Sequence, residues 1–415
     1  MNIQEMREGQ IITFYSYKGG TGRTMALANI SVITAQFSNI KSNKILLIDW
    51  DLEAPGMHRF FFNYFRYAKE EEIYSGPGLI DFFIHAAEVL KQSYGDRTLS
   101  EEDTRKLLSD LMPGFLSTYV ANTSFPNFQI LKAGAFNDSY TENISRFKWE
   151  EFFNRAPAFF RIFSELLKKE FDYVFIDSRT GENDTSGICT MLMPDKLCLV
   201  FTPNRQSLDG VKKMARKSLS YRLTSSDMRP LMIYPIPSRV ELAEKDLRDQ
   251  WRKGIPEKKL IGFQPTFENL FNEYYSTVKC NLTGYFDEVQ IHHEPKYSYG
   301  EEMAVMNETY TDRLSLTKVY TSIQKKIISD APFWGEGEGI KIYFSYSRKD
   351  QKLVDELSRE LAGENYTIVS SNEIPSGEDQ FRSIESRVLS ADVFIPIVSN
   401  YYQTDSQFSS LEVYT

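Results

Sequence analysis

The stretch "YSYKGGTGRT", residues 15 to 24, has the spacing of a phosphate-binding loop in which one residue is unexpected. A strand-like run precedes it at 11–15 and a helix-like run follows it at 25–35, which is the context such a loop requires. Its glycines let successive backbone N–H groups turn inward around an anion, and the start of the following helix adds a positive end. The residue before the threonine is Arg23, where a lysine normally stands.

The arginine changes what the loop is expected to do. A lysine at this place is a compact charge along the β- and γ-phosphates, whereas arginine presents a broader planar fork. Arg23 can bind phosphate, but with a different fit. We therefore expect nucleotide binding to survive while ATP turnover is slow. The alternative is that Arg23 points into solvent at the start of the helix.

Length and composition limit the class of protein. The chain has 415 residues, enough for two or three domains, and 41% hydrophobic with 25% charged residues is ordinary globular composition. A net charge of -9 argues against a nucleic-acid-binding face. Three cysteines without CxxC spacing fit a reducing cytoplasm and exclude a disulfide framework or a cysteine zinc site. No stretch approaches the roughly 18 to 20 apolar residues of a membrane span, so we expect an intracellular protein without a membrane partner.

Short apolar runs alternate with segments long enough for helices, which predicts a mainly parallel sheet covered on both faces. The predicted fold class is α/β, a doubly wound P-loop domain. Further helices are expected at 241–253 and 309–327. The predicted strands are IITFYSY (11–17), KILLIDW (44–50), FQILKAG (128–134), YVFIDS (173–178), KLCLVFTP (196–203) and LMIYPIP (231–237).

A long helical segment, residues 60–112, separates the second and third of these runs. It is rich in aromatic residues and contains clustered charge. An insertion of this size is expected to pack as a helical layer beside the sheet. The alternative is a surface that binds a partner.

A second α/β unit begins after the run "FWGEGEGIK". Alternating glycine and glutamate over residues 335–339 hold a helix or a strand poorly, so this run is the expected linker. The predicted domains are a nucleotide-binding domain at 1–332, a linker at 333–339 and a smaller unit at 340–415. Beyond the linker the predicted elements are a strand at 340–347, a helix at 351–362, a strand at 366–371, a helix at 381–391, a strand at 393–399 and a helix start at 406–415.

Carboxylates follow two of the predicted strands. Asp49 and Asp51 end the run "KILLIDWD", and Asp177 ends "YVFIDS". Because the carboxyl ends of parallel strands meet at one edge of the sheet, these side chains should face the same crevice as the phosphate loop.

Four motifs, "KGGTGRT", "LLIDWDLEAPG", "DYVFIDSRTG" and "VFTPNRQS", together resemble the deviant Walker-A ATPases of the MinD/ParA type over residues 8–330. The resemblance implies ATP or GTP with Mg²⁺ as cofactors. It also implies a homodimer in which Lys18 reaches the phosphates of the other subunit's nucleotide. Asp51 would help position the attacking water. The implied nucleotide contacts are Lys18, Gly19, Gly20, Thr21, Gly22, Arg23, Thr24, Met25 and, near the base, Arg239, and the implied metal ligands are Thr24, Asp49 and Asp177.

Residues 340–415 resemble a Toll/interleukin-1 receptor (TIR) domain, with a flavodoxin-like α/β fold, through "IKIYFSYSRKD", "SSNEIPSGEDQ", "SADVFIPIVSNYY" and "SQFSSLE". In enzymatic members a helix glutamate supports cleavage of NAD⁺, and Glu412 fills that place as the implied catalytic residue. Phe408 and Ser409 stand where that family usually has Trp and Cys.

The remaining expectations for this unit also come from the resemblance. Ile374 to Gln380 would form the BB loop, through which TIR domains assemble, and Tyr346 and Arg348 could line the same cleft as Glu412. Glu412 could instead be an ordinary exposed glutamate. A unit of this length is shorter than the roughly 100 to 150 residues of most domains, so we expect an incomplete TIR domain.

Two functions follow as hypotheses. In the first, a nucleotide-dependent dimer brings TIR units together so that they degrade NAD⁺, in bacterial defence against phage and with other defence proteins as possible partners. In the second, the TIR unit is a non-catalytic adaptor of an ATP-controlled scaffold. A cargo-positioning ATPase ranks below both. The cluster of His292, His293 and Glu294 lacks metal-ligand spacing, and we expect it on a surface loop.

Overall fold

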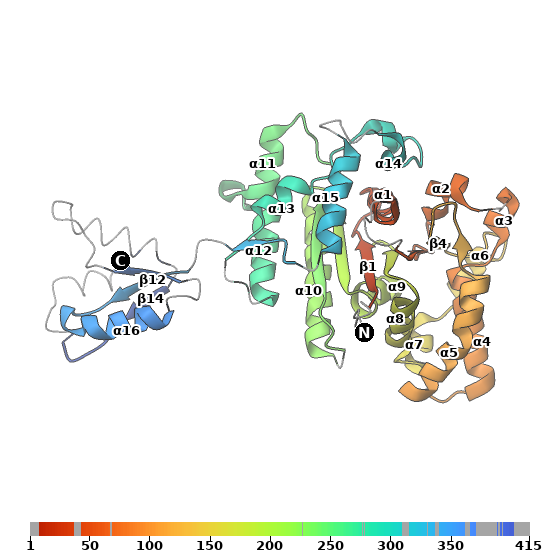
Figure 1. The fold of residues 1–415 in the computed structure, drawn as a ribbon, viewed down its shortest axis with the longest axis horizontal. Helices are drawn as coiled ribbons and strands as arrows, with labels where there is room; N and C mark the ends of the chain where they lie inside the picture. The colour runs from red at the N-terminus through yellow and green to blue at the C-terminus, as the bar shows by residue number, and fades with distance from the viewer. Residues whose placement is uncertain are drawn as a thin grey trace, which may run out of the picture. The chain divides into compact units, whose positions relative to one another are not determined.

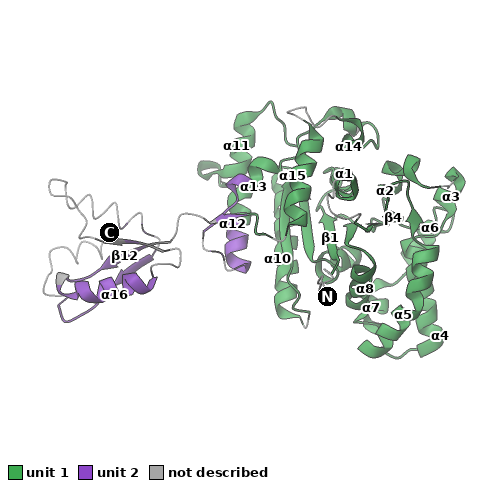
Figure 2. Cartoon of the chain, viewed as in Figure 1, with its two compact units in different colours: residues 1–267, 285–333 green, residues 268–284, 334–415 purple. Residues whose placement is uncertain are grey.

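The protein was analysed as a computed structural model. It describes residues 8–36, 43–66, 69–225, 227–275, 277, 279–308, 315–329, 331–336, 340–361, 366–370, 388, 391 and 393–401. The chain divides into two compact units, residues 1–267 with 285–333 and residues 268–284 with 334–415 (Figure 2).

The first unit is built on a seven-stranded sheet with the strand order β3-β4-β2-β5-β1-β6-β7. Every pairing in it is parallel except that between β3 and β4. The six predicted strands are thereby confirmed, and β3 is an addition that the sequence did not predict. The strands are β1 Gln10–Tyr15, β2 Ile45–Asp49, β3 Ala121–Asn122, β4 Phe128–Leu131, β5 Tyr173–Asp177, β6 Lys196–Phe201 and β7 Met232–Pro237.

Helices cover both faces of this sheet, which is why its strands read as continuous apolar runs. Every residue of β2, β5 and β6 is buried. On one face, α1 (Arg23–Gln36) packs against β1, β2, β5 and α15 (Leu316–Ile328). Alternate residues of β5, Val174 and Ile176, join the hydrophobic core on the other face.

The segment 60–112 contributes to that second core, as predicted. After α3 (Glu70–Ser75), its helices α4 (Leu79–Tyr94) and α5 (Glu101–Thr118) share this core with α8 (Phe159–Glu170) (Figure 1). Phe83 of α4 lies 5.5 Å from Trp50, ring centre to ring centre, directly after β2. The aromatic residues of the insertion therefore pack directly beside the acidic end of β2.

The remaining helices before residue 334 complete this part of the chain. The predicted helix at 241–253 is shorter than expected, and residues 309–314 of the predicted closing helix lie outside the described residues. The helices are α2 Met57–Phe60, α6 Tyr140–Arg146, α7 Trp149–Arg155, α9 Asp184–Gly187 with a π-helical turn at Ile188–Leu192, α10 Arg205–Thr224, α11 Lys245–Lys253, α12 Phe263–Tyr274, α13 Thr283–Glu288 and α14 Ala304–Asn307. Short 3-10 turns span Phe62–Tyr64, Pro256–Lys258 and Pro295–Ser298, and a hairpin pairs β8 (Gly254–Ile255) with β9 (Leu260–Ile261).

The second unit contains a parallel sheet of three strands in the order β13-β12-β14. The strands are β12 Ile340–Ser345, β13 Tyr366–Ser370 and β14 Val393–Pro396, and helix α16, Gln351–Leu361, follows a 3-10 turn at Arg348–Asp350. Ile342, Phe344 and Val354 form its buried core. This confirms the predicted α/β unit, although the predicted helices at 381–391 and 406–415 fall almost entirely outside the described residues.

The expected linker is partly structured. β11, Gly335–Glu336, pairs in antiparallel fashion with β10, Cys280–Asn281. The run was expected to hold a helix or a strand poorly, and the strand that forms in it is only two residues long. Trp334 precedes the strand and stacks on Tyr275, with ring centres 5.8 Å apart.

Within the described part of the chain, no helix combines the length and the apolar character that crossing a bilayer requires.

Candidate functional site

The glycine-rich loop between β1 and α1 has the backbone that a phosphate cradle needs. Gly20 and Gly22 have φ values of 75° and 82°, in the left-handed region that favours glycine. A Cβ atom at Gly22 would also lie 3.4 Å from Ser238 Oγ. Helix α1 begins at Arg23, so the unpaired N–H groups of its first turn lie at the end of the loop.

Two tyrosines hold this loop in place. The Tyr15 hydroxyl donates to the carbonyl of Gly181 over 3.2 Å. The ring of Tyr17 packs on Gly210 of α10 so closely that a Cβ atom there would lie 2.0 Å from the ring. The carbonyl of Lys18 accepts a hydrogen bond of 2.9 Å from Ser16 Oγ, while its side chain is half-buried. The loop is thus braced by two distant segments of the chain.

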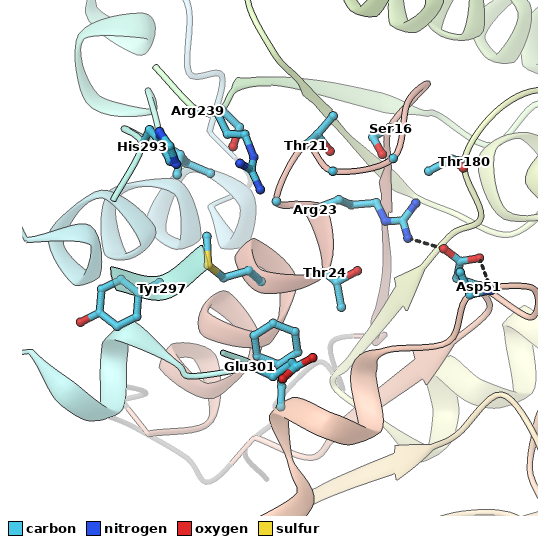
Figure 3. Close-up of a pocket in the computed structure, with 18 of the residues that line it drawn as sticks. Ser16, Thr21, Arg23, Thr24, Asp51, Thr180, Arg239, His293, Tyr297 and Glu301 are labelled. Carbon is cyan, nitrogen blue, oxygen red and sulfur yellow. Dashed lines mark hydrogen bonds and ion pairs between the residues drawn. The ribbon is translucent and has the colours of Figure 1, made fainter. Parts of the chain in front are cut away.

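A cavity of about 530 Å³ opens beside the loop, at the carboxyl ends of the parallel strands (Figure 3). All the predicted nucleotide contacts except Lys18 line it. Asp51 lines it as well, and Arg239 and His293 lie on the side of Arg23 away from Asp51. On the loop side it is lined by Ser16, Gly19, Gly20, Thr21, Gly22, Arg23, Thr24, Met25, Asp51, Glu53, Ala54, Phe60, Arg179 and Thr180. On the far side it is lined by Ser238, Arg239, Ile291, His292, His293, Glu294, Tyr297, Tyr299, Gly300 and Glu301.

Three carboxylates converge behind the loop, as the strand ends predicted. Asp49 accepts hydrogen bonds from the backbone N–H groups of Asp51, over 3.2 Å, and Met57, over 3.1 Å. Asp177 accepts a bond of 2.7 Å from the Thr24 hydroxyl. Asp49 and Asp177 are almost completely buried, whereas Asp51 reaches the cavity.

Arg23 is the positive charge of this cluster. Its Nε lies 2.5 Å from Asp177 Oδ1 and its Nη2 lies 2.9 Å from Asp51 Oδ2. Only 5% of the residue is exposed, so the alternative in which Arg23 points into solvent is wrong. The side chain instead turns from the start of α1 toward the acidic strand ends (Figure 3).

Burial and charge act in opposite directions on these groups. Burial raises the pKa of Asp49, and the neighbouring Asp177 carboxylate raises it further. Burial by itself would lower the pKa of Arg23, but the carboxylates of Asp177 and Asp51 outweigh it and raise that pKa. The guanidinium therefore stays charged inside the cluster.

A divalent cation fits this arrangement poorly. Hydroxyl and carboxylate oxygens are the ligand types that Mg²⁺ prefers. However, each carboxylate oxygen of Asp49, Asp51 and Asp177 already accepts a hydrogen bond from the protein. Among the described residues no group of three or more His, Cys, Asp or Glu side chains is arranged to hold a metal ion. The cluster as it stands holds a guanidinium where the prediction placed a metal ion.

Three buried polar atoms at the cavity have no partner in the described structure. They are Thr21 Oγ1, Arg23 Nη1 and Ser238 Oγ, and each belongs to a residue that lines the cavity. Because buried polar groups are almost always hydrogen-bonded, three such atoms around one cavity indicate a polar ligand. The loop amides and these atoms suit the oxygens of a phosphate ester.

On the far side of the cavity only Arg239 was predicted from the sequence. His292 and His293 line this side as well, and His293 Nδ1 lies 2.9 Å from Glu241 Oε1. Hydrogen bonds of 3.0 Å from Val240 N to Ile291 O and from His293 N to Val240 O join this segment to the end of β7. No local motif signals such a contact, since about fifty residues separate its two sides.

The residue at the turn of this far side has an unusual backbone. Arg239 has a φ value of 54°, which is uncommon for a residue with a side chain. Such conformations persist where the surrounding structure demands them and often lie at binding sites. Tyr299 is 93% exposed at the rim of the cavity.

The predicted residues of the second unit are only partly described. Glu412, Phe408 and Ser409 and the segment 374–380 lie outside the described residues. Tyr346 is half-buried, and its hydroxyl lies 3.0 Å from Gln351 Oε1. Because Glu412 lies outside the described residues, the cleft that Tyr346, Arg348 and Glu412 would share stays a prediction.

Comparisons with known proteins found one matching family model and several solved structures that are similar to the chain. Residues 342–414 match the family model of the TIR domain. The chain is similar to the cell division ATPase MinD of Pyrococcus furiosus, with 18% identity over 76% of this chain and 99% of that chain and a TM-score of 0.41. It is also similar to the septum site-determining protein MinD of Pyrococcus horikoshii complexed with Mg-ADP, with 18% identity, 77% and 98% coverage and a TM-score of 0.42.

A ParA family ATPase from Chlorobium tepidum is similar as well, with 15% identity over 76% of this chain and 98% of that chain and a TM-score of 0.41. No protein of curated function matches the chain. The family match agrees with the predicted TIR unit. The predicted α/β fold of the preceding part is confirmed by its own parallel sheet and by the glycine loop that leads into α1.

Proposed function

We propose that the chain is a nucleotide-dependent switch in which a P-loop domain, residues 1–332, controls a TIR unit, residues 340–415, that cleaves NAD⁺. The observation that carries the first half is the set of three unpartnered buried polar atoms around the cavity beside the glycine loop. The match of residues 342–414 to the TIR family supports the second half.

The nucleotide would lie across the cavity from the loop to its far side. The amides around Gly20 and Gly22 and the start of α1 suit the phosphates. Arg239 and the histidine pair, 292 and 293, provide donors and rings of the kind that contact a nucleobase. The cavity volume of about 530 Å³ is in the range of small-molecule and cofactor sites.

The switch would act by dimerisation. Lys18 lies in the loop after β1. It is not among the described residues that line the cavity. A lysine beside the loop that does not face its own cavity is available to reach the nucleotide of a second copy. Two copies closed around nucleotide would bring their TIR units together, and assembly through residues 374–380 would follow.

The chemistry of the TIR unit would centre on Glu412. Loss of nicotinamide leaves positive charge on the ribose, and a carboxylate near the ribose stabilises that charge while water attacks. Depletion of NAD⁺ in an infected bacterial cell would serve defence against phage, alongside other defence proteins.

The test follows nicotinamide release from NAD⁺ by the whole chain, with and without ATP or GTP. We expect release that increases with nucleotide and is lost in Glu412→Ala, with Glu360→Ala on the exposed side of α16 as the matched control. Absence of release under every oligomerising condition would leave the scaffold with a non-catalytic TIR adaptor.

The dimer has its own test by light scattering. Lys18→Ala should abolish the nucleotide-dependent dimer, whereas Lys245→Ala, an exposed lysine on α11, should leave it intact. A dimer that forms equally well in Lys18→Ala would remove the cross-subunit role of this lysine.

A further inference from the structure

We propose that the Arg23 guanidinium takes the place of a divalent cation in this pocket, so that phosphate binding does not depend on a metal ion. The inference rests on the proposed nucleotide site, and it concerns what neutralises the acidic strand ends beside it.

The first step is the bridging geometry of Arg23. Its Nε holds Asp177 at 2.5 Å and its Nη2 holds Asp51 at 2.9 Å, so one guanidinium joins the ends of β2 and β5. The third nitrogen, Nη1, is buried and has no hydrogen-bond partner among the residues that the structure describes. Since Arg23 lines the cavity, Nη1 is placed to donate to a phosphate oxygen while the other two nitrogens keep the carboxylates.

The second step is that the carboxylates are fully engaged. Asp177 accepts from Arg23 and Thr24, Asp51 from Arg23 and the Ala54 amide, and Asp49 from two backbone amides. A metal ion coordinating Asp51 or Asp177 would need the oxygens that Arg23 holds. Cation and guanidinium therefore compete for the same atoms.

The third step is that the guanidinium holds these atoms strongly. Asp177 is 1% exposed and Arg23 is 5% exposed, so their attraction is little weakened by water. Moving Arg23 to a phosphate would leave two carboxylates without a counter-charge inside the protein, which is strongly unfavourable. The arrangement of lowest cost keeps the arginine on both carboxylates and adds the phosphate to Nη1.

A lysine would behave differently at this place. Its ammonium is a point charge on a flexible stem and has no planar fork that can hold two carboxylates and a phosphate at once. With the lysine on the phosphates, Asp51 and Asp177 would need another cation. Arg23→Lys should therefore make binding depend on a metal ion.

The first experiment measures the Kd of a fluorescent ATP analogue in Mg²⁺ and in EDTA. We expect the two values to differ by less than about threefold in the wild-type chain and by more than about tenfold in Arg23→Lys. Arg146→Lys, the same change at an exposed arginine on α6, should behave as the wild type. A tenfold loss in EDTA for the wild type would overturn the inference.

The second experiment needs no nucleotide. Arg23→Gln leaves Asp51 and Asp177 without their cation. Mn²⁺ without nucleotide should therefore raise the Tm of this variant, and adding the variant to Mn²⁺ should weaken the electron paramagnetic resonance signal of the free ion. Neither effect is expected for the wild type, and adding Asp177→Asn to Arg23→Gln should remove both.

The outcomes separate the two ideas. Mn²⁺ binding to the wild type as tight as to Arg23→Gln would overturn the inference even if nucleotide binds. Absence of nucleotide binding in every variant would remove the proposed function, whereas the Mn²⁺ comparison would still decide whether Arg23 occupies the cation position. If Arg23→Gln does not fold, the Mn²⁺ comparison is made with Arg23→Lys, where retained exclusion of Mn²⁺ would count against the inference.

Discussion

Arg23 and Lys132 are two buried cations at the carboxyl edge of the same sheet, and the structure treats them differently. Arg23 is 5% exposed and Lys132 is 3% exposed. Arg23 meets two carboxylates, whereas Lys132 donates through its Nζ to the backbone carbonyls of Ile73 and Tyr74 at the end of α3. Burial lowers the pKa of Lys132 to about 8, while the carboxylates raise that of Arg23.

The difference shows that the partners, not the burial, decide what a buried cation does. Burial acts on both groups in the same direction, toward loss of the proton. At Lys132 the carboxylate of Asp81 offsets the effect of burial only in part, and the Nζ of this lysine donates to carbonyl groups at the end of α3. At Arg23 the two negative charges of Asp51 and Asp177 reverse the effect of burial on the pKa. As a consequence, both carboxylates depend on one side chain for their counter-charge. Replacing Arg23 should therefore change the charge of the cavity wall.

The largest effect is expected where the charge pairing is broken. Arg23→Met leaves Asp51 and Asp177 without a counter-charge and should lower the free energy of unfolding at pH 7 by about 3–5 kcal/mol. The loss should shrink at low pH, because protonated carboxyl groups need no cation. Denaturant unfolding followed by tryptophan fluorescence measures it. Arg146→Met at an exposed site is the control, and a loss no larger than that of the control would show that the pairing is not what stabilises the cluster.

The next effect concerns Lys132, whose hydrogen bonds go to backbone carbonyl groups. Below its ordinary pKa of 10.5 the unfolded chain keeps the proton of Lys132, whereas the folded chain begins to lose it near pH 8. Stability should therefore rise with pH between about 8 and 10.5, by at most about 1.4 kcal/mol per pH unit. Lys132→Met should lose this rise. Its control is Lys91→Met on the exposed side of α4, and an unchanged rise in Lys132→Met would contradict the assignment.

A smaller effect is expected from His58, which neighbours Lys132. Burial, Arg59 and Lys132 lower the pKa of His58 to about 4. Its contribution to stability is full above the ordinary pKa of 6.5 and is lost as the pH falls toward 4, by about 1–2 kcal/mol between pH 7 and 5. His58→Phe should remove this loss, since the ring lies 4.5 Å from Phe136 and can be replaced by another ring. The exposed His85→Phe should keep it, and equal behaviour of the two variants would refute the prediction.

The smallest effect is expected from Asp81, the charged neighbour of Lys132. The carboxylate of Asp81 raises the pKa of Lys132 against the stronger effect of burial. Asp81→Asn keeps an oxygen for the amides of Gly78 and Ala135 but removes the charge. The alkaline rise in stability should then begin at a lower pH, by a fraction of a unit. Asp110→Asn, at an exposed position of α5, is the control and should not shift the pH at which stability begins to rise. An unshifted onset in Asp81→Asn would show that Asp81 and Lys132 do not interact.

Much of the fold was predictable because its signals are local. The six apolar runs became strands of one parallel sheet, and the glycine run with its flanks became the loop between β1 and α1. The acidic strand ends were predictable for the same reason, since parallel strands carry their carboxyl ends to one edge. β3 and β11 were missed because two-residue strands have no periodicity to detect.

The candidate site was predictable on its loop side and, through the family resemblance, at Arg239 on its far side. His292 and His293 lie at the cavity because the end of β7 pairs with a segment about fifty residues further along the chain. No spacing rule connects two segments that distant. The same holds for Gly210, whose lack of a side chain admits the ring of Tyr17.

The sequence by itself determined that a glycine-rich loop with P-loop spacing, a parallel sheet and a TIR-like unit are present, because each has a pattern in neighbouring residues. Only the tertiary structure decided what Arg23 does. Its two carboxylate partners lie 28 and 154 positions away along the chain, and their distance from the guanidinium depends on how β2 and β5 pack beside α1. A local pattern can place a charge on an element, but the element's neighbours in space determine which opposite charge it meets.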